Sequence, residues 1–79
     1  MNNNNSIGTL VEIYERIKDI DYWPKCFFNG TQWRYYDLAM EHVQFGTIGV
    51  IIDDFEDNSK VVLLNNKLYC VLTDFLRPL

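Results

Sequence analysis

The sequence predicts an α+β fold, in which an N-terminal amphipathic helix packs on a small antiparallel sheet. The first observation is the helical spacing of apolar residues over positions 9–21, and the second is a series of β-branched runs, separated by turn residues, after position 47. The third is size, because 79 residues, of which 48% are hydrophobic and 23% charged, can build one small core. We therefore expect a disordered tail over residues 1–5 and a single folded domain over residues 6–79.

The helix is expected over residues 9–21. Thr9 and Glu12 form a capping-box pattern, in which each side chain binds a free backbone N–H of the first turn. Pro24 cannot continue a helix and restricts the residue before it to extended backbone, so the helix should end near Asp21. Its buried stripe would consist of apolar residues that recur at three- and four-residue steps: Leu10, Ile13, Tyr14, Ile17 and Ile20.

A β-hairpin is expected next, because Asn29-Gly30 lies between two aromatic-rich runs and favours a two-residue type I′ turn. In that register one face would belong to the core, with the cross-strand pairs Phe28 and Thr31, Cys26 and Trp33, and Pro24 and Tyr35. The other face would carry the pairs Phe27 and Gln32, Lys25 and Arg34, and Trp23 and Tyr36.

The rest of the chain predicts a short helical turn and then a three-stranded meander. The helical turn is expected over residues 37–44, capped by Asp37. Strands are expected over residues 47–52, 60–64 and 67–72, joined by an acidic turn over 53–59 and by Asn65-Asn66.

The meander strands also predict which side chains are buried. Ile48, Val50 and Ile52 would form the core face of the first strand. The run over residues 61–64 is apolar on both sides, so it needs cover on both faces, from the helix or from another chain.

The C-terminal part resembles the small SH3-like barrels. A G-x-x-G strand at Gly46 and Gly49 is followed by an acidic loop, two strands around an Asn turn, and a terminal L-x-P-L segment from Leu76 to Leu79. The resemblance covers roughly the last 35 residues and implies, as one form of the sheet, a partly open barrel of about five strands. Because such barrels bind proteins, peptides or nucleic acids, it implies binding rather than catalysis, and it assigns no binding residue.

Charge and composition narrow the class of protein. The net charge of -4 and the pI near 4.6 oppose binding to a phosphate backbone, so nucleic acid is not the expected partner. The sequence has no long apolar run and no signal-peptide pattern, so we expect no membrane contact and a cytoplasmic location. Cys26 and Cys70 are far apart and lack neighbours at metal-ligand spacing, so two reduced thiols are expected.

Two groups of residues are candidate partner-binding surfaces. The first is the aromatic and basic face of the hairpin, which comprises Trp23, Lys25, Phe27, Arg34 and Tyr36. The second is an acidic patch of Asp53, Asp54, Glu56 and Asp57. The alternatives are that the helix covers the aromatic residues and that the acidic residues form a solvated turn.

No catalytic centre, metal site or cofactor is expected. The acidic residues lack the spacing of a calcium-binding EF-hand loop. A nucleophilic pair of Cys26 or Cys70 with His42 has no family signature around it. The sequence therefore does not favour an enzyme.

The expected function is that of a small interaction protein, which binds a protein partner and inhibits or modulates it, in the manner of a phage- or mobile-element-encoded regulator. The alternatives are a nucleic-acid-associated protein that uses the aromatic and basic face, and a DNA-mimicking inhibitor that uses the acidic patch. The supply of large apolar side chains exceeds what one small core encloses, which also predicts a homodimer or a patch covered in a complex.

Overall fold

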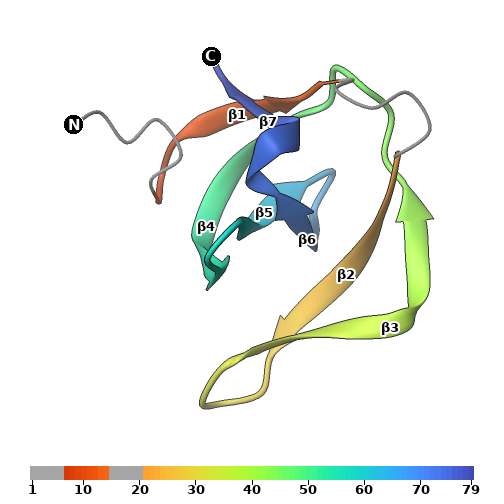
Figure 1. The fold of residues 1–79 in the computed structure, drawn as a ribbon, viewed down its shortest axis with the longest axis vertical. Helices are drawn as coiled ribbons and strands as arrows, with labels where there is room; N and C mark the ends of the chain where they lie inside the picture. Colours follow the sequence, from red (N-terminus) through yellow and green to blue (C-terminus); the bar gives the residue numbers. More distant parts are fainter. Residues whose placement is uncertain (1–6, 15–20) are drawn as a thin grey trace.

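The computed structural model describes residues 7–14 and 21–79, and in this part the protein is built from antiparallel strands (Figure 1). The elements follow in the order β1 (Leu10–Ile13), β2 (Tyr22–Phe28), β3 (Trp33–His42), β4 (Ile48–Glu56), β5 (Ser59–Leu64), β6 (Lys67–Leu72), the 3₁₀ helix η1 (Thr73–Phe75) and β7 (Leu76–Pro78). The strand order is β3-β2-β6-β5-β4-β1-β7. The result is a small antiparallel β-sheet domain, compatible with a small β-barrel-like fold.

The predicted α+β class is wrong, because the described part of the chain contains no α-helix. Residues Leu10–Ile13 form β1, which pairs with both β4 and β7. Val11 and Ile13 point inward and are fully buried. Every second side chain of β1 is therefore buried, as in a strand, and not every third or fourth one, as the helix prediction required. Ile17, Ile20 and the tail expected over 1–5 lie outside the described residues.

The meander of β4, β5 and β6 confirms the three strands predicted in the C-terminal half. Asn65 and Asn66 join β5 to β6 with φ values of 52° and 65°, the left-handed pair that a two-residue hairpin turn requires and that Asn tolerates. The acidic turn is shorter than predicted, because β4 continues to Glu56 and the turn consists of Asp57 and Asn58.

The inward face of β4 is the opposite of the predicted one. Ile51 is fully buried, whereas Ile48 and Ile52 are exposed. Gly49 also faces inward, and a Cβ atom at this position would collide with the carbonyl oxygen of Leu63 on β5. The missing side chain therefore allows the two strands to approach closely, with Ile51 rather than Ile48 in the core.

The hydrophobic core lies inside the curved sheet. Trp23 of β2 and Phe75 of η1 meet edge to face, with ring centroids 4.9 Å apart. The other buried members come from β1, β4, β5, β6, β7 and the segment after β3: Val11, Ile13, Val43, Ile51, Val62, Leu64, Tyr69, Val71 and Leu76.

The 3₁₀ helix η1 connects β6 to β7. The hydroxyl of Thr73 donates to the carbonyl oxygen of Asn58 at 3.2 Å, which fixes η1 beside the β4–β5 turn. No helix in the described part of the chain has the length and apolar character needed to cross a membrane.

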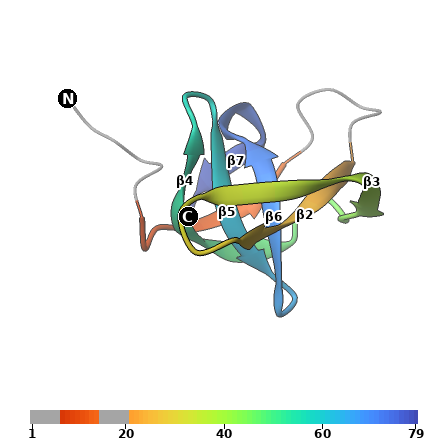
Figure 2. The ribbon, with the colours of Figure 1, turned by 90° about the horizontal axis from the view of Figure 1, so that it is seen from below.

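The hairpin of β2 and β3 covers the second face of the meander, and Figure 2 shows both strands crossing β5 and β6. Val61 and Val62 point to opposite faces of β5, and both are fully buried. The two-sided cover predicted for this strand is therefore present here, and a hairpin rather than a helix provides it.

The hairpin differs from its prediction in register and length. Phe28 pairs with Trp33 and Cys26 with Tyr35, because the loop spans residues 29–32 instead of two residues. A shift of two residues keeps these side chains on one side of the hairpin. The prediction that this side belongs to the core is wrong for Phe28 and Tyr35, which are 53% and 47% exposed, while Cys26 is buried. The helical turn predicted over 37–44 is wrong, since β3 continues to His42.

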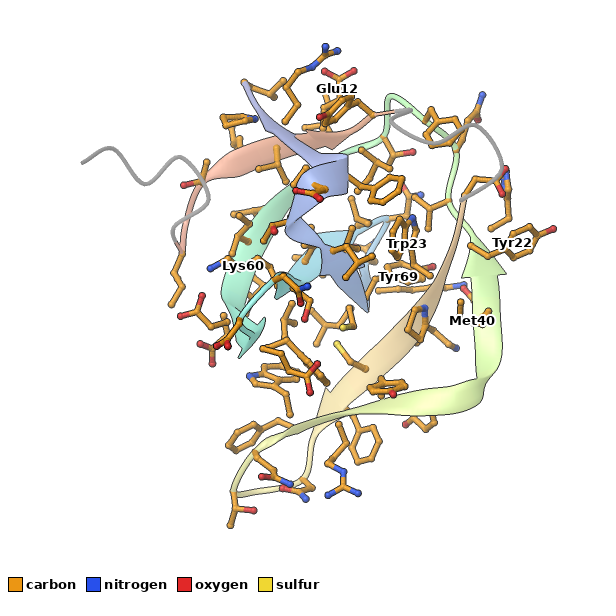
Figure 3. The ribbon with its side chains drawn as sticks, viewed as in Figure 1. Glu12, Tyr22, Trp23, Met40, Lys60 and Tyr69 are labelled. Atoms are coloured by element: carbon orange, nitrogen blue, oxygen red, sulfur yellow. The ribbon has the colours of Figure 1, made fainter. Side chains whose placement is uncertain are left out.

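The β2–β3 pairing is irregular beside Pro24, where the register shifts between Pro24 and Cys26. Trp23 pairs with Glu41, which also contacts Lys25, so Trp23 and Lys25 lie on the same side of β2 as predicted. Trp23 is nevertheless only 4% exposed, because Phe75 of η1 packs against it. Figure 3 shows Trp23 and Tyr69 between β2 and the central strands, with Tyr22 pointing away.

Glu41 of β3 links the hairpin to β6. Its carboxylate accepts a hydrogen bond from the Tyr69 hydroxyl at 2.8 Å and lies 3.3 Å from Lys25 Nζ and 3.4 Å from Lys67 Nζ. The Tyr69 hydrogen bond is the main cause that lowers the pKa of Glu41, while burial and then Glu41 raise the pKa of Tyr69 to about 12. The hairpin is thereby held on the meander by polar contacts as well as by Trp23.

Candidate functional site

The hairpin loop over residues 29–32 is organised by Asn29. Its side-chain Oδ1 accepts hydrogen bonds from the backbone N–H of Thr31 and Gln32, each at 2.9 Å, and from the Thr31 hydroxyl at 3.0 Å. Gly30 adopts φ 104°, a conformation that favours glycine. This ordered loop sets the position of Trp33, the first residue of β3.

Trp33 connects the hairpin tip to the acidic end of β4. Its Nε1 donates to Asp53 Oδ2 at 2.9 Å, and Asp53 Oδ1 accepts the backbone N–H of Asp54 at 2.8 Å. The bond from Trp33 and then the bond from Asp54 hold the pKa of Asp53 below its ordinary value. Asp53 therefore stays ionised and fixed at this junction.

A cleft of about 680 Å³ opens where these two regions meet, and we call it the acidic cleft. The hairpin tip forms one side, with Phe28, Thr31, Gln32, Trp33, Arg34 and Tyr35. The end of β4 forms the other side, with Asp53, Asp54, Phe55 and Glu56. The cleft therefore combines aromatic walls with three carboxylates and one guanidinium, that of Arg34.

A second cleft of about 390 Å³ adjoins the first, and we call it the apolar cleft. The two clefts share Tyr35, Phe55 and Glu56, and the rings of Tyr35 and Phe55 lie 5.7 Å apart between them. The rest of its lining is mostly apolar and comes from β2, β3, β5 and β6: Tyr22, Trp23, Pro24, Met40, Ser59, Cys70 and Leu72.

Trp23 brings an unusual feature to the wall of the apolar cleft. Its indole Nε1 is buried and has no hydrogen-bond acceptor in the described part of the chain. A buried donor without a partner costs about 1 to 3 kcal/mol.

The acidic residues differ in whether they are neutralised. Lys60 Nζ forms an ion pair with Asp54, and Asp53 is held by Trp33. Glu56 and Asp57 are exposed and have no ion-pair partner within residues 7–14 and 21–79. The unpaired negative charge therefore lies at Glu56, which lines both clefts, and at the adjacent Asp57.

The predicted aromatic and basic face is only partly assembled. Phe27 and Tyr36 are neighbours, with ring centroids 4.8 Å apart, and Arg34 pairs with Phe27 across the hairpin. Lys25 is engaged by Glu41, and Trp23 is buried against Phe75 in the core.

The thiols and the histidine are not arranged for nucleophilic catalysis. Burial, with a contribution from Cys70, raises the pKa of Cys26 to about 12, and burial also raises the pKa of Cys70. The Nε2 atom of His42 lies 3.0 Å from Asp21 Oδ2, so a carboxylate rather than a thiol engages this histidine. Neither thiol is activated, because the thiolate is the reactive form.

The residues the structure describes bring together no group of three or more His, Cys, Asp or Glu side chains that could hold a metal ion. The acidic patch is spread along β4 and its turn, so its carboxylates do not converge on one point. Its arrangement suits a cationic side chain of a partner, which needs one or two carboxylates at the edge of a cleft.

The contact between Trp33 and Asp53 was not expected from the sequence. Trp33 was expected on the core face and Asp53 in a turn, and no local pattern links two residues that far apart. The signal that could have pointed to it is Phe55, a large aromatic residue between acidic neighbours, which is unusual for a solvated turn.

Comparison of the chain with protein-family models, with curated proteins and with solved structures finds no significant match.

Proposed function

We propose that this protein is a non-enzymatic interaction module, which binds a basic, extended segment of a protein partner in the acidic cleft and thereby inhibits or modulates that partner. The observation that carries the proposal is the junction itself. The hairpin tip and the acidic end of β4, two surfaces that are separate in the sequence, line one cleft of about 680 Å³.

The charge distribution supports a basic segment. Glu56 and Asp57 lack cationic partners in the described part of the chain, and the net charge of the protein is -4. An Arg or Lys side chain of the partner would give Glu56 a charge-assisted hydrogen bond at the edge of a partly desolvated cleft.

The apolar cleft supports an extended segment with apolar neighbours. Tyr35 and Phe55 stand between the two clefts, so a segment that crosses them would place a basic side chain on one side and an apolar side chain on the other. Aromatic walls of this kind dominate the energetics of protein interfaces.

The proposed framework is an SH3-like barrel, formed by β7, β1, β4, β5 and β6. Their order in the sheet and the curvature that the two β4 register shifts introduce support this interpretation. The hairpin of β2 and β3 would then be an addition to the barrel that forms one wall of both clefts.

A screen of short random peptides tests the proposed ligand class. The selected peptides should contain Arg or Lys beside apolar residues, and their binding should weaken as salt screens the charges. Glu56→Lys should lower the affinity about tenfold or more, since it places a like charge at the cleft.

The matched control is Glu12→Lys, which makes the same change of charge on β1, outside both clefts and at the opposite end of β4 from Glu56. It should leave the affinity nearly unchanged. Selection of acidic or uncharged peptides, or an equal loss of affinity in both variants, would contradict the proposed site.

The nucleic-acid alternative retains one specific support, the exposed Arg34 beside the Phe27–Tyr36 ring pair. It would require salt-sensitive binding of single-stranded oligonucleotides that Tyr36→Ala abolishes and Glu56→Lys strengthens. These results together would favour nucleic-acid binding over peptide binding in the acidic cleft.

A further inference from the structure

The wall between the two clefts combines two aromatic rings with one carboxylate. Tyr35 of β3 and Phe55 and Glu56 of β4 line both the acidic and the apolar cleft, and we call these three residues the shared wall. Tyr35 is 47% exposed, Phe55 is half-buried and Glu56 is exposed. A ligand that crosses from one cleft to the other therefore contacts the shared wall.

A bulge in β4 places Phe55 and Glu56 in this wall together. Neighbouring residues of a regular strand point to opposite faces, which would separate the ring from the carboxylate. The pairing of β4 with β5 runs from Asp54 and Lys60 directly to Glu56 and Ser59, which leaves Phe55 without a counterpart. A bulge of this kind re-aims a side chain and is common next to functional sites. β4 therefore presents a ring and a carboxylate to the same two clefts.

The charges around the shared wall favour one additional cation at Glu56. Lys60 is paired with Asp54, and no basic side chain of the described residues forms an ion pair with Glu56. Arg34 lines the acidic cleft only, and the described lining of the apolar cleft contains no basic residue. A cationic side chain is therefore attracted to Glu56 at the apolar side of the wall, where Arg34 opposes it least.

The rings determine which cation suits this position. The ring centroids of Tyr35 and Phe55 lie 5.7 Å apart with the planes at 57°, so the rings contact each other and leave no slot between them. A planar, weakly hydrated guanidinium can lie flat on an exposed ring face while its N–H groups donate to a carboxylate beside the ring. A Lys ammonium is a compact and strongly hydrated charge, so covering it with an aromatic wall costs more.

We propose that the shared wall selects arginine over lysine, so that the basic residue of the bound segment is an arginine whose guanidinium stacks on Tyr35 or Phe55 and donates to Glu56. This inference rests on the proposed function, which by itself requires only a basic side chain. Tyr35 and Phe55 are then the residues that determine specificity, and the methylene groups of the arginine cover apolar surface in the same cleft.

A competition among matched peptides tests the selection of arginine. Short peptides carry Arg, Lys or the neutral analogue citrulline at one fixed central position, in equal amounts, with random residues on both sides. The immobilised protein should retain Arg peptides about tenfold over Lys peptides, and Lys peptides over citrulline peptides. The dissociation constants of one retained Arg peptide and of its Lys counterpart then measure the discrimination directly.

Variants of Tyr35 show whether the ring causes the discrimination. Tyr35→Leu should reduce the preference for Arg to about twofold or less, whereas Tyr35→Phe, which keeps the ring, should preserve it. Tyr36→Leu is the matched control, because Tyr36 is 46% exposed on the same strand but lines neither cleft, and it should keep the wild-type preference. Thermal unfolding should remain cooperative in all three variants, and Phe55→Leu repeats the test from β4.

The possible results separate this inference from the proposed function. Equal retention of Arg and Lys peptides, both above citrulline peptides, overturns the selection of arginine and leaves the binding of a basic segment standing. Equal retention of all three kinds, or of none, overturns both. A preference for Arg that neither Tyr35→Leu nor Phe55→Leu reduces overturns the role of the shared wall.

Discussion

The strands of the meander and the strand β1 obtain their partners in different ways. β4 pairs with β5 and β5 pairs with β6, so each pair is consecutive along the chain, and a two-residue turn such as Asn65-Asn66 sets the register. In contrast, β1 is held between β4 and β7, which lie far along the chain. The register of the meander is therefore encoded locally, whereas β1 is a strand because β4 and β7, both distant in the sequence, pair with it.

The hairpin of β2 and β3 stands between these two cases. Its turn is local and is set by Asn29, but its position on the meander depends on distant contacts, in particular those of Trp23, Glu41 and Trp33. Substitutions in the meander, in β1 and in the hairpin should therefore change the stability of the protein by different amounts.

The largest effect is expected at Gly49, where β1, β4 and β5 come together. Gly49→Val would force side-chain atoms into the carbonyl oxygen of Leu63 and the side chain of Leu64, at a cost above about 4 kcal/mol, which approaches the whole stability of a small domain. Circular dichroism should show loss of the cooperative transition. Gly46→Ala is the control, because nothing lies within 4 Å of its Cβ position and only the φ of 92° opposes it. Equal stability of the two variants would mean that the strands do not approach closely at Gly49.

The next largest effect distinguishes the two faces of β4. Ile51→Ala should lower the free energy of unfolding by about 3 kcal/mol, because Ile51 is fully buried, whereas Ile52→Ala should change it by less than about 1 kcal/mol. Urea denaturation of both variants measures the difference. The reverse order would show that the face predicted from the sequence, with Ile48 and Ile52 inward, is the correct one.

A smaller, pH-dependent effect is expected where the hairpin meets β4. The pKa of Asp53 is lowered from its ordinary value of 3.8, so its contacts stabilise the fold above that pH, and this contribution is lost as the pH falls through and below it. In Trp33→Phe the main cause of the shift is absent. Its melting temperature should therefore fall less steeply than that of the wild type between about pH 5 and pH 2.

Asp53→Asn provides the control for this effect, since it removes the titrating group. Its pH profile should resemble that of Trp33→Phe. If all three profiles are parallel, the Trp33–Asp53 hydrogen bond does not contribute to folding, and the wall of the acidic cleft is not held as described.

The sequence predicts the meander well because the relevant signals are local. Runs of β-branched residues and Asn65-Asn66 lie within a few positions of the groups they organise. The helix prediction over 9–21 was wrong in its first part because Leu10 and Ile13 fit both a helical spacing and a strand. The pairing of Leu10 with Val50, which decides between them, leaves no trace in a local window.

The candidate site was likewise predictable only where its signals are local. Its two walls, the aromatic hairpin and the acidic residues of β4, could be identified separately from composition. Their meeting could not, because it depends on the way the hairpin crosses the meander and on the bond from Trp33 to Asp53. Trp23 is buried for a similar reason, because Phe75, more than fifty residues later, packs against its indole ring.

The most direct test of the proposed site follows the indole N–H signal of Trp33 in an NMR titration with a short Arg-containing peptide. The indole N–H signal of Trp33, bonded to Asp53 in the wall of the acidic cleft, should shift saturably as peptide is added. The same titration of Glu56→Lys should leave that signal close to its starting position. A Trp33 signal that does not move in the wild type, or that moves equally in both proteins, would contradict binding in this cleft.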